Sequence, residues 1–241
     1  MKTAVITVGK EILTGKTVNT NLTTISRKLK SIGIDVSRSF VIDDQKEEYY
    51  KLLDIVDEEL IIFTGGLGPT VDDISRETVI EYFDVETYID EETLNVNKSY
   101  FKRMNITYHE TNHKQALFPV DSIKLENKLG TAPGVYFETK GKKIVLFPGP
   151  PHEMKPMLEK VVTILKGQMN TTLFSKGFKL VGTGESTMEE KMKGFYEKHE
   201  AVNIAPYAGI GEIKYIFTSS NKDKLEKALN AFYDIFKAYI Y

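Results

Sequence analysis

The sequence predicts an α/β fold, in which a three-layer, mostly parallel sheet is followed by a smaller C-terminal α+β domain. Apolar runs rich in β-branched residues alternate with segments of helical periodicity in the first half of the chain, as in strand–helix–strand units. Glycine-rich loops follow several of these runs directly. A polar, weakly patterned segment at 167–175 then interrupts the chain, so we predict one domain at 1–168 and a second at 175–241.

The first half of the chain alternates between strand and helix patterns. The predicted elements are a strand at 3–8, a helix with Leu22, Ile25, Leu29 and Ile32 on one face, a strand at 35–42, a helix with Leu52, Leu53 and Val56, and a strand at 60–63. Gly33 stands where a C-cap glycine belongs, and Asp44 with Glu47 resembles a capping box at the start of the second helix. This order indicates a parallel sheet with helices on both faces.

The second half is less regular. We predict a helix at 90–104, a short helix or loop at 111–119, a hairpin of 135–139 and 143–147 around Lys140–Lys142, a helix after Pro151 to about 165, then a strand at 178–182, a helix at 186–198, strands at 202–206 and 212–218, and a helix at 221–238. The last five of these elements make the small α+β domain.

The composition excludes several classes of function. The 241 residues carry a formal net charge of -2 and no cysteine, which removes disulfides, thiol catalysis and cysteine-based zinc sites. Lysine and arginine are spread along the chain, so we expect no direct binding of nucleic acid and no membrane partner. The apolar run at 4–8 is too short for a signal peptide, and we expect a cytoplasmic location.

The segment Thr64–Asp73 is the strongest local indication of a binding site. Gly65, Gly66 and Gly68 follow a buried strand, and their backbone N–H groups can approach an anion at the start of the next helix. We therefore predict phosphate binding by these glycines and Thr70. Asp72 and Asp73 would lie in the first helical turn, where they can hold a divalent cation against phosphate oxygens. The alternative is a plain helix start, with Thr70 as N-cap and Asp73 at the third helical position.

A second loop, Gly9–Thr17, resembles a Walker A loop but has five residues between its glycines instead of four. We therefore disfavour an ATPase. Glu11 and Asn19 still lie near the carboxyl end of the first strand, the edge at which open parallel sheets bind ligands. We expect both to contact substrate, although Asn19 taken alone fits an N-cap of the next helix better.

Two more loops fall at strand ends. Asn127–Gly134 contains Thr131 and Gly134, and Pro148–Met154 contains Gly149 and Glu153. Either loop alone could be a rigid connector. Because all these loops lie at strand ends, we expect them to converge on one edge of the sheet and form a site there.

These motifs together resemble the CinA family (competence/damage-inducible protein A), and the resemblance covers essentially the whole chain. The matching motifs are Gly9-x-Glu11, Gly15 with Val18–Asn21, Thr64–Thr70 with Asp72 and Asp73, Asn112 with Gln115 and Ala116, Gly130–Gly134, Pro148–Pro151 with Glu153 and Met154, Gly182–Ser186, and Ile204–Tyr207. The blocks Thr64–Asp73 and Pro148–Met154 are the most specific of them.

The resemblance implies a molybdopterin-binding-type domain followed by a KH-like domain. It implies hydrolysis of ADP-ribose to AMP and ribose 5-phosphate with a divalent metal ion (Mg, Mn or Co), in a homodimer. Carried onto this chain, the glycines of the 64–70 loop would hold phosphate, and Asp72 and Asp73 would bind the metal or position water. Glu11 and Glu153 would complete an acidic rim, with Glu153 among the catalytic groups.

Two alternatives stay open at the level of sequence. The chain could bind or adenylylate molybdopterin, as other members of the fold do, or act as a non-enzymatic binding protein associated with competence and DNA damage. Two departures from the family pattern also matter. Lys10 stands where most relatives have Thr or Asp, and no C-terminal domain for deamidation of nicotinamide mononucleotide follows, so that activity is not expected.

Overall fold

The computed structural model describes residues 1–169 and 173–241, which divide into two compact units. The larger unit holds residues 1–30 and 34–167, and the smaller holds 31–33 and 168–241. Residues 170–172, in the middle of the segment where we predict the domain boundary, lie outside the described residues.

A six-stranded sheet forms the centre of the larger unit. Its strands are, in sheet order, β2 (Val36–Ile42), β1 (Thr3–Val8), β3 (Leu60–Thr64), β8 (Lys142–Phe147), β7 (Gly134–Thr139) and β6 (Ile123–Leu125). The first four run parallel, and β7 is antiparallel to both of its neighbours. The predicted fold class, a mostly parallel α/β sheet with a smaller α+β domain, is confirmed.

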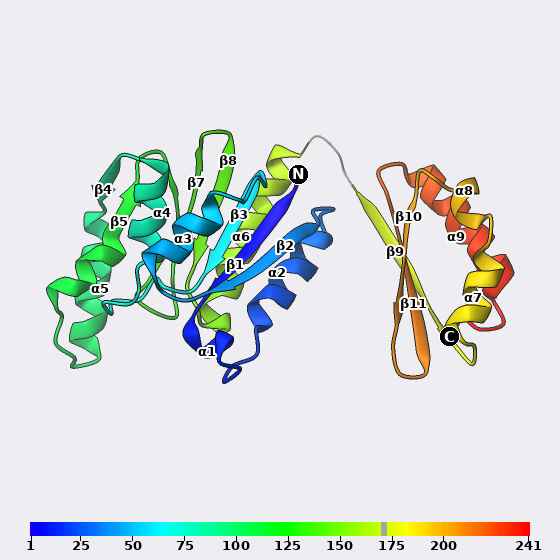
Figure 1. The fold of residues 1–241 in the computed structure, drawn as a ribbon, viewed down its shortest axis with the longest axis horizontal. Helices are drawn as coiled ribbons and strands as arrows, with labels where there is room; N and C mark the ends of the chain where they lie inside the picture. Colours follow the sequence, from blue (N-terminus) through cyan, green and yellow to red (C-terminus); the bar gives the residue numbers. More distant parts are fainter. Residues whose placement is uncertain (170–172) are drawn as a thin grey trace. The chain divides into compact units, whose positions relative to one another are not determined.

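The central strands are apolar because helices cover both of their faces. Every residue of β1 and β3 is buried, as expected for parallel strands enclosed on two sides. α3 (Lys46–Leu53) and α4 (Ser75–Phe83) pack on one face, where alternate strand residues such as Ile6 and Phe63 join their core. α2 (Thr20–Lys30) and α6 (Pro151–Gln168) cover the other face (Figure 1).

A small subdomain follows α4. β4 (Thr87–Ile89) and β5 (Leu117–Pro119) pair in an antiparallel ribbon, and α5 (Glu91–Arg103) and the 3-10 helix η1 (Glu110–Ala116) lie between them in sequence (Figure 1). Asp90 caps α5 by accepting a hydrogen bond from the Thr93 backbone N–H. The remaining helix of this unit, α1 (Lys10–Leu13), is a single turn directly after β1.

The smaller unit is a three-stranded antiparallel sheet with helices on one face (Figure 1). Its elements are β9 (Phe174–Val181), α7 (Glu185–Met192), α8 (Phe195–Lys198), β10 (Asn203–Ala208), β11 (Glu212–Ser219) and α9 (Lys222–Phe236). The single helix predicted at 186–198 is wrong: Gly194, with φ of 75°, separates two helices. Phe232 of α9 centres an aromatic core with Tyr215 and Phe217.

The predicted capping box at the start of α3 is also wrong. Gln45 is the N-cap residue, and no side chain bonds to the helix start there. The side chain of Asp44 is therefore available for another role. None of the helices in the described ranges is both long and apolar enough to cross a membrane.

Candidate functional site

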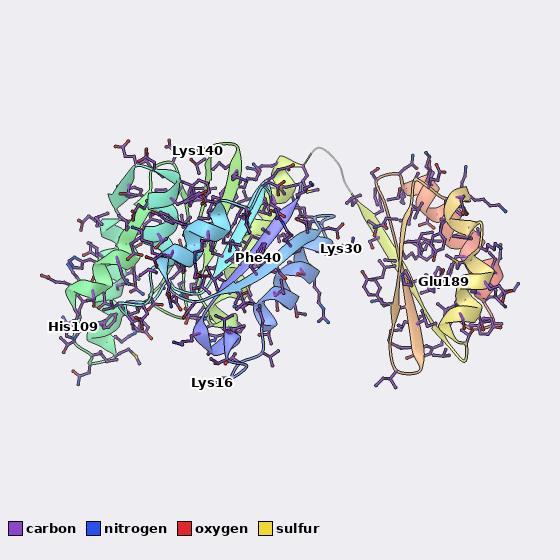
Figure 2. All side chains as sticks on the ribbon, viewed as in Figure 1. Lys16, Lys30, Phe40, His109, Lys140 and Glu189 are labelled. Carbon is purple, nitrogen blue, oxygen red and sulfur yellow. The ribbon has the colours of Figure 1, made fainter. Side chains whose placement is uncertain are left out.

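The loops at the carboxyl ends of the parallel strands surround one cavity of about 520 Å³. Loops after β1, β2, β3 and β8 contribute to its wall, and the loop that precedes β7 completes it, because β7 runs in the opposite direction. Figure 2 marks the two edges of the sheet: Lys16 follows β1 at this edge, whereas Lys140, in the β7–β8 turn, lies at the other. The convergence expected from the loop positions is therefore present.

The structure brings most of the predicted site residues together. The cavity wall includes Glu11, Gly65, Gly66, Gly68, Asp73, Thr131, Gly149 and Glu153. Four other predicted residues, Asn19, Thr70, Asp72 and Gly134, do not line it. Asp72 and Thr70 are exposed on the loop just outside the wall.

The glycines after β3 are required by the backbone and by close packing. Gly65 and Gly66 have φ of 110° and 67°, which side chains with a Cβ rarely adopt. A Cβ on Gly65 would lie 2.2 Å from the Val8 carbonyl oxygen, and one on Gly66 would lie 2.2 Å from Ser75 Oγ. The loop therefore approaches the end of β1 and the start of α4 more closely than any other residue type allows, while its glycines also line the cavity.

Asp73 closes a turn instead of starting a helix. Its Oδ2 accepts hydrogen bonds from the Thr70 backbone N–H at 3.0 Å and from Thr70 Oγ1 at 2.5 Å, and α4 begins only at Ser75. The prediction that Asp72 and Asp73 occupy the first helical turn is thus wrong, and so is the alternative with Thr70 as N-cap. The turn orients the Asp73 carboxylate toward the cavity that Gly68 also lines.

Lys114 fixes this acidic loop from the side of η1. Its Nζ donates to the carbonyl oxygens of Thr70 at 2.5 Å and Asp73 at 2.6 Å. The ammonium is also 3.8 Å from Glu77 Oε1. The cation therefore holds the backbone of the loop and leaves the aspartate side chains free of an ion pair with it.

Asp44 is a site residue that sequence reasoning missed. It follows β2 and lines the cavity with Glu11 and Asp73. Burial, and after it the negative charges of Asp73, Asp43, Glu11 and Asp72, raise the pKa of the Asp44 carboxyl to about 6. The pair Asp43-Asp44 at the end of a predicted strand could have indicated this role, but its resemblance to a helix cap concealed it.

Glu153 also lines the cavity and is held by its neighbours. Asn127 Nδ2 donates to Glu153 Oε2 at 2.6 Å and to the Ala132 carbonyl oxygen at 3.0 Å. A Cβ on Gly130 would lie 2.6 Å from Glu153 Oε2, so the loop before β7 packs directly on the carboxylate. Glu153 and this loop are therefore positioned as one unit.

Three buried polar side chains that the sequence analysis did not assign to the site support the cavity wall. Asn21 Nδ2 donates to Thr64 Oγ1 at 2.8 Å and to the Gly149 carbonyl oxygen at 2.7 Å, which ties the loops after β3 and β8 together. Gln115 lines the cavity, and its Nε2 lies 3.3 Å from Thr131 Oγ1.

The third of these residues is Arg76, which is 2% exposed. Its guanidinium donates to the carbonyl oxygens of Gln115 and Leu117 at 2.8 and 2.9 Å and to that of Pro133. Burial lowers its pKa to about 10. Arg76 thereby joins α4 to two segments that border the cavity.

Two predicted binding residues have structural roles. Asn19 precedes α2 and caps it, since its Oδ1 accepts a hydrogen bond from the Leu22 backbone N–H at 3.1 Å. Gly134 is buried at the start of β7, where a Cβ would lie 2.7 Å from the Leu146 carbonyl oxygen. This glycine allows β7 to pack against its neighbours, and its position gives no access to the cavity.

The donor set of the cavity fits a hard divalent cation that arrives with a phosphate ligand. Among the described residues, no three histidine, aspartate or glutamate side chains are grouped so that they could hold a metal ion alone. Mg²⁺ is usually bound through one or two carboxylates, with phosphate oxygens and waters as further ligands. The oxygens of Asp44 and Asp73 beside the glycine loop match that requirement.

Comparison with known proteins agrees with this architecture. Residues 4–167 match the family model described as "Probable molybdopterin binding domain". The chain is 38% identical over 227 residues to a competence-damage inducible protein of Caldicellulosiruptor saccharolyticus, covering 93% of this chain and 55% of the relative. It is 39% identical over 230 residues to a CinA-like protein of Kosmotoga olearia, again covering 93% and 55%.

A solved structure supports the same assignment. The crystal structure of the CinA protein of Thermoplasma acidophilum, described as a protein of unknown function, has a TM-score of 0.61 and 34% identity, and the match covers 68% of this chain and 97% of that one. The chain spans about half the length of the curated relatives it matches. From the family match over most of its length and the similarity to these relatives, the chain belongs to the CinA family and carries its molybdopterin-binding-type domain.

Proposed function

We propose that this chain hydrolyses the diphosphate bond of a nucleotide, with ADP-ribose as the substrate and AMP and ribose 5-phosphate as products. One observation carries the proposal: the glycine loop Gly65–Gly68 and the carboxylates of Glu11, Asp44, Asp73 and Glu153 line the same cavity. Backbone N–H groups suit phosphate oxygens, and carboxylates suit a divalent cation and a water molecule. The raised pKa of Asp44 supports the proposal, because its causes are burial of the carboxyl and, after it, the negative charges of the neighbouring carboxylates, both of which a bound cation would offset.

In this proposal the groups that line the cavity divide into those that bind a cation and those that bind phosphate. Asp44 and Asp73 bind a cation such as Mg²⁺, Mn²⁺ or Co²⁺, which neutralises charge on the diphosphate. Asp73 is preferred to Asp72 because the Asp72 side chain is exposed outside the cavity wall. The backbone N–H groups of Gly66–Gly68 orient one phosphate, since the Gly65 N–H donates to the Phe147 carbonyl oxygen.

Glu153 is the group proposed to act on water. Its carboxylate orients the water molecule and accepts its proton while the water oxygen forms a bond to phosphorus and the bridging P–O bond breaks. Asn127 holds Glu153 in place through the hydrogen bond of 2.6 Å.

The test is a substrate panel on the purified chain. ADP-ribose, FAD, NAD and coenzyme A would each be incubated with Mg²⁺, Mn²⁺ or Co²⁺ and with excess chelator, and AMP would be quantified by chromatography. We expect AMP release from ADP-ribose only when a divalent cation is present. Equal release in excess chelator would contradict a requirement for the metal ion. No release from any of the four compounds would contradict the proposed hydrolase activity.

Binding of a molybdopterin-type pterin is the second candidate, favoured by the match of residues 4–167 to the family model. The chain has no tryptophan, so pterin fluorescence can be followed without indole emission. Saturable binding of the pterin, with release of pyrophosphate when ATP is added, would favour this candidate over diphosphate hydrolysis.

A further inference from the structure

A second cavity of about 840 Å³ borders the glycine-loop cavity, and the hydrolysis itself makes no use of it. Tyr100, Gly130 and Thr131 line both cavities, so one surface runs from the glycine loop into this groove. The volume is within the range of roughly 300 to 1,000 Å³ that is typical of small-molecule sites. The groove therefore has room for the part of a substrate that extends away from its phosphates.

The groove has two walls that are held together. One wall is a face of α5, where Glu92, Val96, Tyr100 and Arg103 recur at helical spacing. The other wall is the segment 124–133 before β7. Lys124 joins them, since its Nζ donates to Asp90 Oδ2 at 2.7 Å and to Glu92 Oε2 at 2.6 Å at the start of α5.

The chemistry of the walls suits a nucleobase. The guanidinium of Arg103 lies 5.5 Å from the centroid of the Tyr100 ring, and bases stack on both kinds of planar group. Asn95 on α5 offers an amide group, which can form paired hydrogen bonds with a base edge. Val96 and Pro133 are the aliphatic side chains of the lining, and charged, polar and aromatic side chains and a glycine make up the rest.

The groove also connects to the groups proposed for hydrolysis. Asn127 lines the groove while it donates to Glu153 in the first cavity. Thr131 lines both cavities and contacts Gln115. A ligand with phosphates at Gly65–Gly68 thus reaches the groove past Tyr100.

We propose that this groove is the nucleoside subsite, which takes the base of the nucleotide against Tyr100 and Arg103. The inference rests on the proposed function for the position of the phosphates. It predicts that the chain recognises the adenosine half of ADP-ribose more strongly than the ribose 5-phosphate half.

The experiment measures binding, by calorimetry on the full chain, of AMP and of ribose 5-phosphate. Both carry a ribose 5-phosphate group, and AMP adds the base. Because a base gains affinity by stacking on an aromatic side chain, we expect AMP to bind about fivefold to a hundredfold more tightly than ribose 5-phosphate. We call the ratio of the two affinities the AMP margin. Val96→Trp, at a groove position that is 57% exposed, should obstruct the groove and abolish the AMP margin. Ile55→Trp, at a position that is 61% exposed and outside both linings, should preserve it.

Substitution of the ring separates stacking from filling of the groove. Tyr100→Ala should lose the margin, and Tyr100→Phe should keep it, because a phenyl ring still stacks. Equal binding of the two ligands by the wild-type chain, or a margin that survives in Val96→Trp, would overturn the subsite. The hydrolase proposal has a separate outcome, since absence of turnover together with an intact AMP margin would remove hydrolysis and leave the subsite standing.

Discussion

At the scale of single residues, the site consists of carboxylates that repel one another around a neutral glycine loop. Asp44 is the most affected, because it is partly buried and faces the charges of Asp73 and Glu11. Such an arrangement is unfavourable in the free protein and becomes favourable when a cation binds. Function and stability therefore oppose each other at Asp44.

The first prediction concerns turnover. Asparagine has nearly the shape of aspartate but no charge, so Asp44→Asn and Asp73→Asn should each lower AMP release from ADP-ribose by roughly a hundredfold or more at saturating metal. Asp121→Asn is a matched control, because Asp121 is exposed, lines neither cavity and has φ of 59°, a conformation that asparagine adopts readily. If both site variants match the control in turnover, the metal does not bind at Asp44 and Asp73.

The second prediction concerns stability at the same residue. At pH 7 Asp44 is charged although burial and its neighbours disfavour the charge. Asp44→Asn removes that cost, and after allowance for solvent screening we expect the larger unit to gain about 1 to 2 kcal/mol and to melt a few degrees higher. Addition of Mg²⁺ should raise the melting temperature of the wild type more than that of the variant. A variant that melts lower than wild type at pH 7 would contradict the repulsion.

At the scale of elements, the sequence predicted long regular segments well and short ones poorly. β1 and β3 are apolar throughout, and α2 repeats Ile25 and Leu29 on its buried face, so their periodicity identified them. β4, β5 and β6 have three residues each, which is too few for a period to show.

Predictions from the local sequence were also wrong where one pattern fits two structural roles. Asp44 after a strand looks like a helix cap, and Asp73 before α4 looks like the first turn of that helix. The role of Arg76 could not be predicted from the sequence, because its hydrogen-bond partners are backbone carbonyl groups far away in the chain.

The third prediction tests the ion pair that ties β2 to the segment before β3. Arg38 Nε and Nη2 donate to Glu58 Oε1 and Oε2 at 2.5 and 2.7 Å, and the Glu58 side chain is 2% exposed. These hydrogen bonds lower the pKa of Glu58 to about 2, against an ordinary value of 4.5. Because the folded pKa is depressed, the pair stabilises the fold above pH 4.5, and this contribution is lost as the pH falls from 4.5 toward 2.

Glu58→Gln should therefore destabilise the larger unit by about 1 to 2 kcal/mol at pH 7, since Arg38 is partly exposed and its charge is screened. The difference in melting temperature from wild type, followed by circular dichroism, should shrink as the pH approaches 2. Glu59→Gln is the control at the neighbouring position, where the side chain is 61% exposed. A deficit that is the same at pH 7 and near pH 2 would exclude the charge of Glu58 as its cause.

At the scale of the whole molecule, the two units have separate hydrophobic cores. One core packs β1, β3, α3 and α4 of the larger unit, and the other packs β9, β11 and α9 around Phe232 of the smaller unit. Every residue that lines the glycine-loop cavity and the groove lies between Val8 and Glu153, inside the larger unit. The proposed chemistry is thus assigned to one unit, although the similarity to CinA relatives covers both.

The last prediction follows from that separation. A fragment of residues 1–168 keeps the whole sheet β2-β1-β3-β8-β7-β6 and all the carboxylates of the site. We expect it to fold, as judged by a cooperative melting transition, and to release AMP from ADP-ribose with kcat/KM within about threefold of the full chain, a change of less than 1 kcal/mol in transition-state stabilisation. The Asp73→Asn fragment serves as the control for contaminating hydrolase activity. A fragment that folds and binds AMP but has lost turnover would show that the smaller unit supplies a group to the reaction, and the proposed mechanism would then need a residue from 169–241.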